Sequence, residues 1–247
     1  MTRRLPSPIF LALLAATVSG GVLASFANRP VITAGIVLLV LGGWAVSLCL
    51  HEFGHAWVAY RGGDHSVRAK GYLTLDIRRY TDPLLSIVLP LVLLLIGGLA
   101  LPGGAVWVDH GALRSRAVRS AVSLAGPLTN LVLAVLLALL VAAVPMPPGL
   151  VLGLSCLAFV QVLAFVLNIL PVPGLDGFGV VEPYLPYGAR RAAAVVRPWA
   201  PLLLFAVLVS VPPLARLFFN VSYQLFTAIG GDPVAASIGF DEFQFWR

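Results

Sequence analysis

Residues 31–60 read VITAGIVLLVLGGWAVSLCLHEFGHAWVAY, a long apolar run with His51, Glu52 and His55 near its end. Two histidines four residues apart lie on one face of a helix, so both imidazoles can reach one metal ion. Glu52 lies beside that face and can accept a proton from a metal-bound water, as in zinc hydrolases. Ionisable groups inside an apolar segment are costly and usually mark a function. The stretch therefore predicts a membrane helix that carries a zinc site.

The composition is that of an integral membrane protein. Of the 247 residues, 60% are hydrophobic and 11% are charged, and the mean hydropathy is +0.98. A soluble domain has about 25% charged residues. No polar stretch is long enough to fold as a separate soluble module. We expect one domain over residues 1–247, with a catalytic core at about 31–180 and flanking helices at 9–27 and 199–219.

Apolar segments and polar loops alternate along the chain. The apolar segments cover residues 9–27, 31–60, 84–101, 121–144, 149–170 and 199–219. The first is longer than the apolar part of a typical signal peptide, so we interpret it as a retained span. The sequence predicts an all-α polytopic membrane protein with about five full transmembrane helices and one re-entrant or partial segment.

The most polar stretch, Arg61–Asp82, predicts a small β-hairpin associated with the membrane. Tyr72–Ile77 alternates apolar and polar residues with a period of two, as strands do. Lys70-Gly71 is a plausible turn back to Ser66–Ala69. The hairpin would either pair with an extended substrate or shield the metal site from water.

A catalytic zinc ion needs a third protein ligand if one position is to stay open for water. Asp176 is the strongest candidate, because it follows an apolar helix and the Pro and Gly residues around it would unwind the chain. Cys49 is a conceivable ligand, but a packed thiol is the better interpretation. Six loop residues remain as alternatives, although such residues are more often solvated polar groups: Asp64, His65, Asp76, Asp109, His110 and Glu182.

The third ligand restricts the topology. If Asp176 joins His51 and His55, the helices that precede these ligands must end at the same membrane face, so an odd number of crossings must separate them. Two apolar segments lie between them, and one should therefore not cross fully. Leu84–Leu101 is the suspect because Pro90 and two glycines interrupt it, and a re-entrant path is tolerated where protein buries it.

The basic residues support the same topology. With Leu84–Leu101 re-entrant, one side of the membrane receives all the basic residues except Arg29, Arg216 and Arg247. Lys and Arg are enriched in cytoplasmic loops, so the metal site is expected in the cytoplasmic half of a bacterial inner membrane, with the N-terminus inside. The same clustering between apolar segments explains the net charge of +6 without nucleic-acid binding.

Three separated elements resemble the site-2 proteases, a family of intramembrane zinc metalloproteases. HEFGH matches the HExxH of that family, and the run from Asn168-Ile169-Leu170-Pro171 to Leu175-Asp176-Gly177 matches its second motif. The stretch Ala125-Gly126-Pro127-Leu128-Thr129-Asn130 is similar to the Ala-Gly-Pro-x-x-Asn that opens the helix between them. Bacterial members also place a membrane-associated hairpin after HExxH.

The resemblance implies a role for each matching residue. His51, His55 and Asp176 would bind one Zn2+ ion per chain, Glu52 would be the catalytic base, and Asn168 would bind the substrate backbone or stabilise the oxyanion. Gly126, Pro127 and Asn130 would serve helix packing. Many relatives have a further histidine before Asp-Pro, where this chain has Tyr80, so the role of that histidine does not carry over. The PDZ and nucleotide-sensing domains of some relatives are also absent.

The expected function is zinc-dependent endopeptidase activity toward transmembrane protein substrates within the lipid bilayer, in regulated intramembrane proteolysis. One alternative is an intramembrane metal transporter, but the outer half of the spans is nearly all apolar. A second alternative is an inactive protein that binds membrane helices, but it would not need Glu52.

Overall fold

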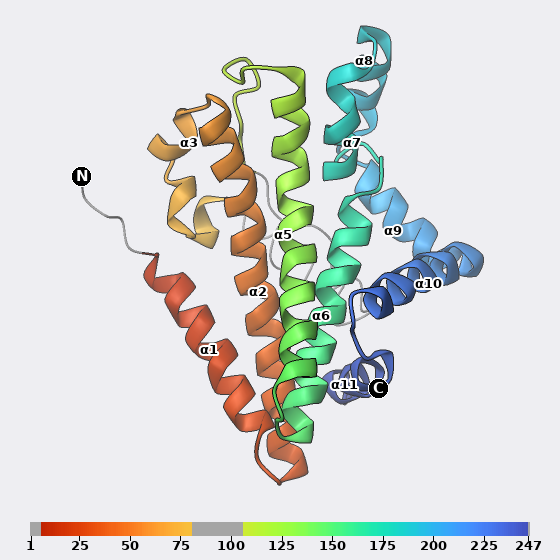
Figure 1. Cartoon of the computed structure of the whole chain (residues 1–247). Helices are drawn as coiled ribbons and strands as arrows, with labels where there is room; N and C mark the ends of the chain where they lie inside the picture. Colours follow the sequence, from red (N-terminus) through yellow and green to blue (C-terminus); the bar gives the residue numbers. More distant parts are fainter. Residues whose placement is uncertain (1–5, 81–105, 247) are drawn as a thin grey trace.

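The computed structural model describes residues 6–80 and 106–246, and long helices dominate it (Figure 1). Four of them form the body of the fold: α1 (Pro8–Ala24), α2 (Arg29–Gly62), α5 (Arg116–Ala143) and α6 (Pro148–Asn168). α2 has 34 residues and carries the HEFGH stretch. The exposed face of α5 is lined by apolar side chains, among them Val132, Leu136 and Leu139. A surface of this kind is stable against lipid rather than water.

Capping residues fix where α2 begins and ends. The side chain of Asn28 accepts a hydrogen bond from the backbone N–H of Val31, and Pro30 occupies the first turn, where no N–H is needed. At the other end Gly63 has φ 123°, a conformation that glycine adopts without strain. The apolar run and its boundary residues therefore produce one uninterrupted helix.

Close backbone contact holds α1 antiparallel to α2. A Cβ added at Gly20 would lie 2.3 Å from the backbone nitrogen of Leu39, and one added at Gly35 would lie 2.3 Å from that of Ala24. Small residues at such contacts allow helices in a membrane to pack closely, where lipid provides no hydrophobic driving force. The first apolar segment is thus packed tightly against the helix that carries both histidines.

α2 and α6 run in the same direction. Ile32, near the start of α2, is the neighbour of Gly149 at the start of α6. Just before the middle of α2, Gly43 is the neighbour of Leu157 near the middle of α6. Figure 1 shows the same arrangement, with α5 running in the opposite direction beside them. The direction that the ligand argument required is confirmed. Leu84–Leu101 lies outside the described residues, so its re-entrant path remains a prediction.

The segment after α2 is not the hairpin that we expected. It forms α3 (Ser66–Ala69) and two 3-10 turns, η1 (Tyr72–Thr74) and η2 (Ile77–Arg79), and the described residues contain no strand. Gly71 and Leu75 are left-handed, with φ 79° and 57°, and so bend the chain before and after η1. The Asp76 side chain accepts a hydrogen bond from the Arg78 N–H and caps η2. The period-two alternation was therefore misleading here.

This segment is instead tied to the first helix. The backbone N–H of Ser7 donates to the Thr74 carbonyl at 3.0 Å, and the Ser7 hydroxyl donates to the Leu75 carbonyl at 3.3 Å. Ser7 also caps α1, since its hydroxyl accepts from the Phe10 N–H. The contacts join the start of α1 to the turns that follow α2.

The C-terminal part consists of shorter helices. They are α7 (Asp176–Val181), η4 (Glu182–Tyr184), α8 (Tyr187–Val196), α9 (Ala200–Ser210), α10 (Pro212–Ala228) and α11 (Pro233–Phe243). The single helix expected over 199–219 is wrong, because the chain breaks at Val211. Pro212 and Pro213 lack the N–H that would continue α9, and they fit only the first turn of α10.

The number of full spans is smaller than expected among the described residues. Three helices, α2, α5 and α6, are long and apolar enough to cross a membrane, and α8 with α9 would make a fourth despite a bend of 66°. α1 has 17 residues, somewhat less than the roughly 20 that a straight crossing needs. Five full spans are therefore not confirmed, whereas an all-helical membrane protein is.

The contact between α1 and α2 predicts a difference between two adjacent glycines. Gly20→Ala should lower the free energy of unfolding by about 1–3 kcal/mol, since its Cβ meets the α2 backbone. Gly21→Ala is the matched control, because its Cβ has only a side-chain atom of Leu150 near it, at 3.4 Å. Thermal unfolding in one detergent compares the two, and equal melting temperatures would contradict the packing described.

Candidate metal centre

His51 and His55 lie one helical turn apart on α2, and their Nε2 atoms are 3.1 Å apart. Each Nδ1 faces a carbonyl oxygen. His51 Nδ1 lies 2.5 Å from the side-chain oxygen of Asn130, and His55 Nδ1 lies 2.6 Å from the backbone oxygen of Val122. Asn130 Nδ2 donates to Gln161 Oε1, and this bond orients the Asn130 side chain so that its own oxygen faces His51. A carbonyl oxygen only accepts, so each Nδ1 carries the ring proton and each Nε2 presents a lone pair.

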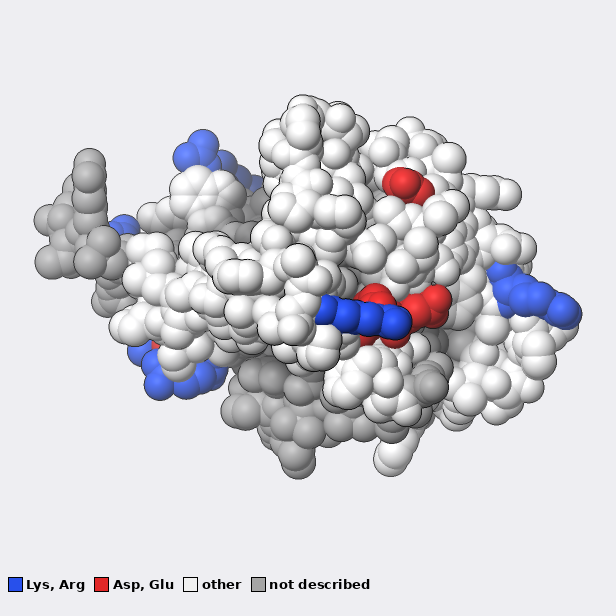
Figure 2. Space-filling view, turned by 90° about the horizontal axis from the view of Figure 1, so that it is seen from below, with Lys and Arg blue, Asp and Glu red and all other residues white. Residues whose placement is uncertain are grey.

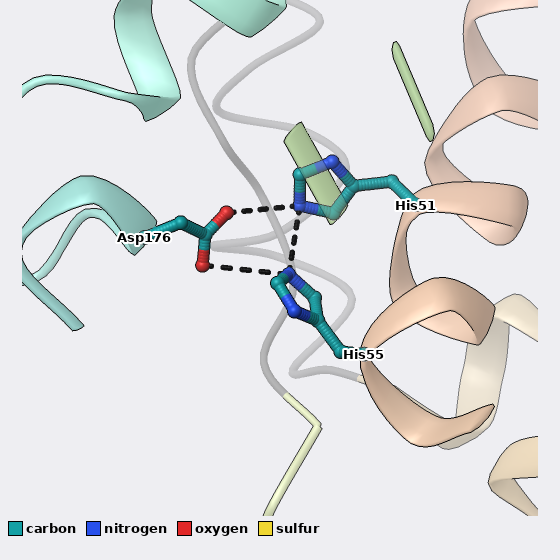
Figure 3. Close-up of side chains that lie close together, drawn as sticks. All are labelled: His51, His55 and Asp176. Atoms are coloured by element: carbon teal, nitrogen blue, oxygen red, sulfur yellow. Dashed lines mark hydrogen bonds and ion pairs between the residues drawn. The ribbon is translucent and has the colours of Figure 1, made fainter. Parts of the chain in front are cut away.

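Asp176 completes the group from the start of α7. Its Oδ2 lies 3.1 Å from His51 Nε2, and its Oδ1 lies 3.4 Å from His55 Nε2. Figure 3 shows the carboxylate pointing between the two imidazoles. The local sequence explains the placement, because α6 ends at Asn168 and the prolines at 171 and 173 prevent its continuation. The turn that follows directs α7 back toward α2.

The three donor groups fit a zinc ion. The two Nε2 atoms lie 3.1 Å apart, and each faces a different oxygen of the Asp176 carboxylate, at 3.1 Å and 3.4 Å. With one donor atom from each residue, all three atoms lie within 4.8 Å of one another, close to the edges of about 3.3 Å of a tetrahedron with zinc–ligand bonds of 2.0–2.1 Å. A single shared proton satisfies only one of the three contacts between these lone pairs, whereas a cation at their centre satisfies all three. Two histidines and one carboxylate leave the fourth position for water or substrate, as in catalytic zinc sites.

Gly126 gives the imidazoles their space. A Cβ at this position on α5 would lie 2.2 Å from His55 Nε2 and 2.5 Å from His51 Nε2. We expected Gly126 to serve helix packing, and in the structure the surface that it packs against is the ligand pair itself. Every other residue type would place a Cβ against the two nitrogens that are the proposed metal ligands.

A chain of polar side chains orients His51 across three helices. Asn130 on α5 accepts from His51 and donates to Gln161 on α6 at 2.8 Å. All three side chains are buried. The sequence suggested only helix packing for Asn130, and Gln161 was missed. Its signal was present, because Gln161 is a carboxamide in the middle of the apolar helix α6, and polar groups there tend to be functional. Partners of this kind hold the tautomer of a ligating histidine.

A cavity of about 230 Å³ opens beside the three donors, and Glu52, Asn168, His110 and Ser123 are among its lining residues. Glu52 is only 3% exposed, and its Oε2 has no hydrogen-bond partner among the described residues. The Asn168 amide N–H donates to the Ala164 carbonyl, while its buried oxygen is also without a partner there. Both side chains thus present an unpaired oxygen at the wall of the cavity.

The other sequence candidates have different positions. Asp64 closes the loop after α2 by accepting from the backbone N–H groups of Ser66 and Asp109. Cys49 lies in the apolar core. His110 lines the cavity but is not part of the ligand group. The remaining candidates pair locally: Asp76 with Arg78, Glu182 with Arg197, Asp109 with the Gly111 N–H, and His65 with the Tyr60 ring.

The orientation of His51 can be tested through metal affinity. Asn130→Ala removes the acceptor of the Nδ1 proton and should weaken zinc binding about 10- to 100-fold. Asn130→Asp keeps an oxygen acceptor at that position and should retain the affinity. Competition with a chelator measures both, and Ser155→Ala provides a buried polar control on α6. Wild-type affinity in Asn130→Ala would show that the contact with His51 is not needed.

Gly126 provides a second, steric test. Gly126→Ala should abolish stoichiometric zinc binding, since the new methyl group overlaps both Nε2 atoms. Gly188→Ala on α8 is the control, because nothing lies within 4 Å of its Cβ position. Zinc content per purified chain, measured by elemental analysis, distinguishes the two variants. A Gly126→Ala protein with one zinc per chain would refute the proposed donor arrangement.

Comparison with known proteins agrees with this geometry. The sequence profile of peptidase family M50 matches residues 36–152, which include HEFGH. Over 246 residues the chain is 46% identical to "Putative zinc metalloprotease Rip2" of Mycolicibacterium smegmatis and 47% identical to the protein of that name from Mycobacterium tuberculosis. In both cases the match covers 98% of this chain and 94% of the relative.

A more distant relative matches a shorter region. "Putative zinc metalloprotease YwhC" of Bacillus subtilis is 34% identical over 155 residues, which is 59% of this chain and 68% of that protein. No solved structure matches the chain. The near full-length similarity and the matching profile lead to one conclusion: the chain belongs to peptidase family M50, the site-2 proteases, and is a zinc metalloprotease.

Proposed function

We propose that the protein is an intramembrane endopeptidase that hydrolyses peptide bonds in or beside the transmembrane segments of other membrane proteins, in regulated intramembrane proteolysis. The observation that carries the proposal is the position of the donor group. His51, His55 and Asp176 converge between membrane-capable helices, next to Glu52, whose Oε2 has no hydrogen-bond partner among the described residues. A soluble protease would not need to bury its centre in an apolar bundle.

Each residue has a proposed role in the reaction. His51, His55 and Asp176 hold the zinc ion, and Glu52 and Asn168 face the reacting groups from the cavity wall. When bound, zinc polarises a peptide carbonyl and lowers the pKa of a water molecule to about 7. Glu52 takes a proton from this water and returns it to the leaving amine. The burial of Glu52 and its Oε2, which has no partner among the described residues, suit this work, because that oxygen can accept a proton without first losing a hydrogen bond.

Asn168 is suited to hold the substrate backbone. One of the two Nδ2 N–H groups donates to the Ala164 carbonyl, and the side-chain oxygen has no partner among the described residues. A carboxamide oxygen accepts a hydrogen bond, and the N–H of an extended peptide is a fitting donor. Of the two roles that the resemblance implied, the unpaired oxygen supports backbone binding, and the second N–H of Nδ2 is a donor for an oxyanion.

The helical state of a transmembrane substrate restricts its cleavage. In a helix each backbone carbonyl accepts a hydrogen bond from the N–H four residues on, so the carbonyl is not free for attack. We infer that the segment to be cut unwinds locally and enters as an extended chain, which also exposes its carbonyl groups.

The distribution of charge supports a cytoplasmic position for the centre. The described basic residues at the metal-site end come from the C-terminal end of α2, the turns after it, the N-terminal end of α5 and the α8 region. They are Arg61, Arg68, Lys70, Arg78, Arg79, Arg114, Arg116, Arg119, Arg190, Arg191 and Arg197. Figure 2 views the opposite end, where uncharged residues cover most of the face. Basic residues favour the cytoplasmic side.

Replacing the proposed base tests the assignment. Glu52→Gln should lower kcat for cleavage of a transmembrane substrate about 100-fold or more and leave zinc near one ion per chain, because Glu52 is not among the ligands. Glu242→Gln, the same chemical change on α11, is the control. Cleavage is followed by gel and mass spectrometry and zinc by elemental analysis. Normal turnover by the Glu52→Gln protein would refute this mechanism.

A further inference from the structure

A second cavity continues from the metal centre toward the basic end of the molecule. It measures about 470 Å³ and shares His110, Ser123, Gly174 and Asp176 with the cavity at the donors. Because Asp176 borders both spaces, a molecule that spans them has one part at the metal centre and another in the second cavity. We refer to this second space as the arginine pocket.

Arginines from two parts of the chain line the arginine pocket. Arg119 comes from the first turn of α5, and Arg190 and Arg197 come from α8 and its end. Two carboxylates also line it, and both are engaged. Asp176 faces the two histidines, and Glu182 accepts from Arg197 at 2.5 Å. Among the described residues, Arg119 and Arg190 have no carboxylate partner.

Arg119 carries the stronger signal of the two. Its Nε is buried and has no hydrogen-bond partner in the described part of the chain, a state that costs free energy unless a ligand satisfies the N–H group. The wall that holds Arg119 is well fixed, since the neighbouring Ser120 hydroxyl donates to the Val180 carbonyl of α7 at 2.6 Å. Arg190 adds a second, exposed guanidinium on the other side of the pocket.

A carboxylate is the group that fits this pair. Guanidinium groups bind carboxylates with charge-assisted, often bidentate hydrogen bonds, and they do so best where water is partly excluded. The ligand has to be part of a peptide, because the pocket is continuous with the cavity in which the peptide bond is cut. An acidic residue placed shortly before or after the scissile bond would occupy the arginine pocket while the backbone passes Asn168.

We propose that the arginine pocket is a specificity subsite that selects substrates with an Asp or Glu side chain close to the scissile bond. The proposal rests on the protease function proposed above and names the chemistry of its substrate. The surrounding basic residues supply the control. Arg116 lies on the same helix as Arg119, and Arg191 follows Arg190, yet neither lines the pocket.

The test uses the full chain in detergent and synthetic transmembrane peptides. One peptide that the wild type cleaves is remade with Glu, Gln or Lys at single positions on either side of the cut. At one of these positions, the kcat/KM of the peptide with Glu should exceed that of the peptide with Gln at least tenfold. Arg119→Gln/Arg190→Gln should reduce this ratio to about one, and Arg116→Gln/Arg191→Gln should preserve it. A wild type without a Glu preference at any position, or a pocket variant that keeps it, overturns the subsite.

A binding experiment separates this inference from the protease function. In a protein that carries Glu52→Gln, the labelled peptide with Glu should bind about tenfold more tightly than the same peptide with Gln. Adding Arg119→Gln and Arg190→Gln should remove this difference. Cleavage of the Gln peptide by the wild type reports on the protease function alone. If the pocket substitutions instead weaken binding to phosphatidylglycerol nanodiscs and leave the peptide preference unchanged, the arginine pocket binds a lipid headgroup and the proposal is wrong.

Discussion

Two imidazole nitrogens that both present lone pairs lie 3.1 Å apart, and a carboxylate faces them. A metal cation at their centre would satisfy all of these atoms at once within an apolar bundle, and the rest of the structure depends on holding the group together. Asn130 and Val122 keep the ring protons on the Nδ1 atoms. Gly126 leaves the volume in which the ion binds. The close contact between α2 and α5 therefore packs the two helices together and also leaves room for the proposed metal ligands.

Much of the centre could be predicted from the sequence. The spacing of His51 and His55 fixes their common helix face, and the need for a third ligand selected Asp176. The requirement that two ligand-bearing helices end at the same face gave the parallel direction of α2 and α6, which the contacts of Ile32 and Gly43 confirm. These features follow from helix geometry and coordination chemistry, which depend little on the remainder of the fold.

Other features could not be predicted, because they depend on contacts between distant segments or on local backbone states. The alternation in Tyr72–Ile77 is as compatible with a strand as with bent turns, and the left-handed Leu75 decides between them. The role of Gln161 appears only when α5 and α6 bring Asn130 to it. The break before Pro212 was visible as a Pro-Pro pair. It was outweighed by the apolar character of the segment, which hydropathy alone treats as continuous.

The proposed ligands are far apart in the sequence, and this has a consequence for biosynthesis. Asp176 follows His55 by about 120 residues. At about 5–20 residues per second, a ribosome needs roughly 6–24 s to add them. During that interval the nascent chain holds both histidines but lacks the carboxylate that completes the centre. The proposed donor group is thus incomplete until α6 has been made and α7 has turned back toward α2, so all three ligands can hold a metal ion only after that point.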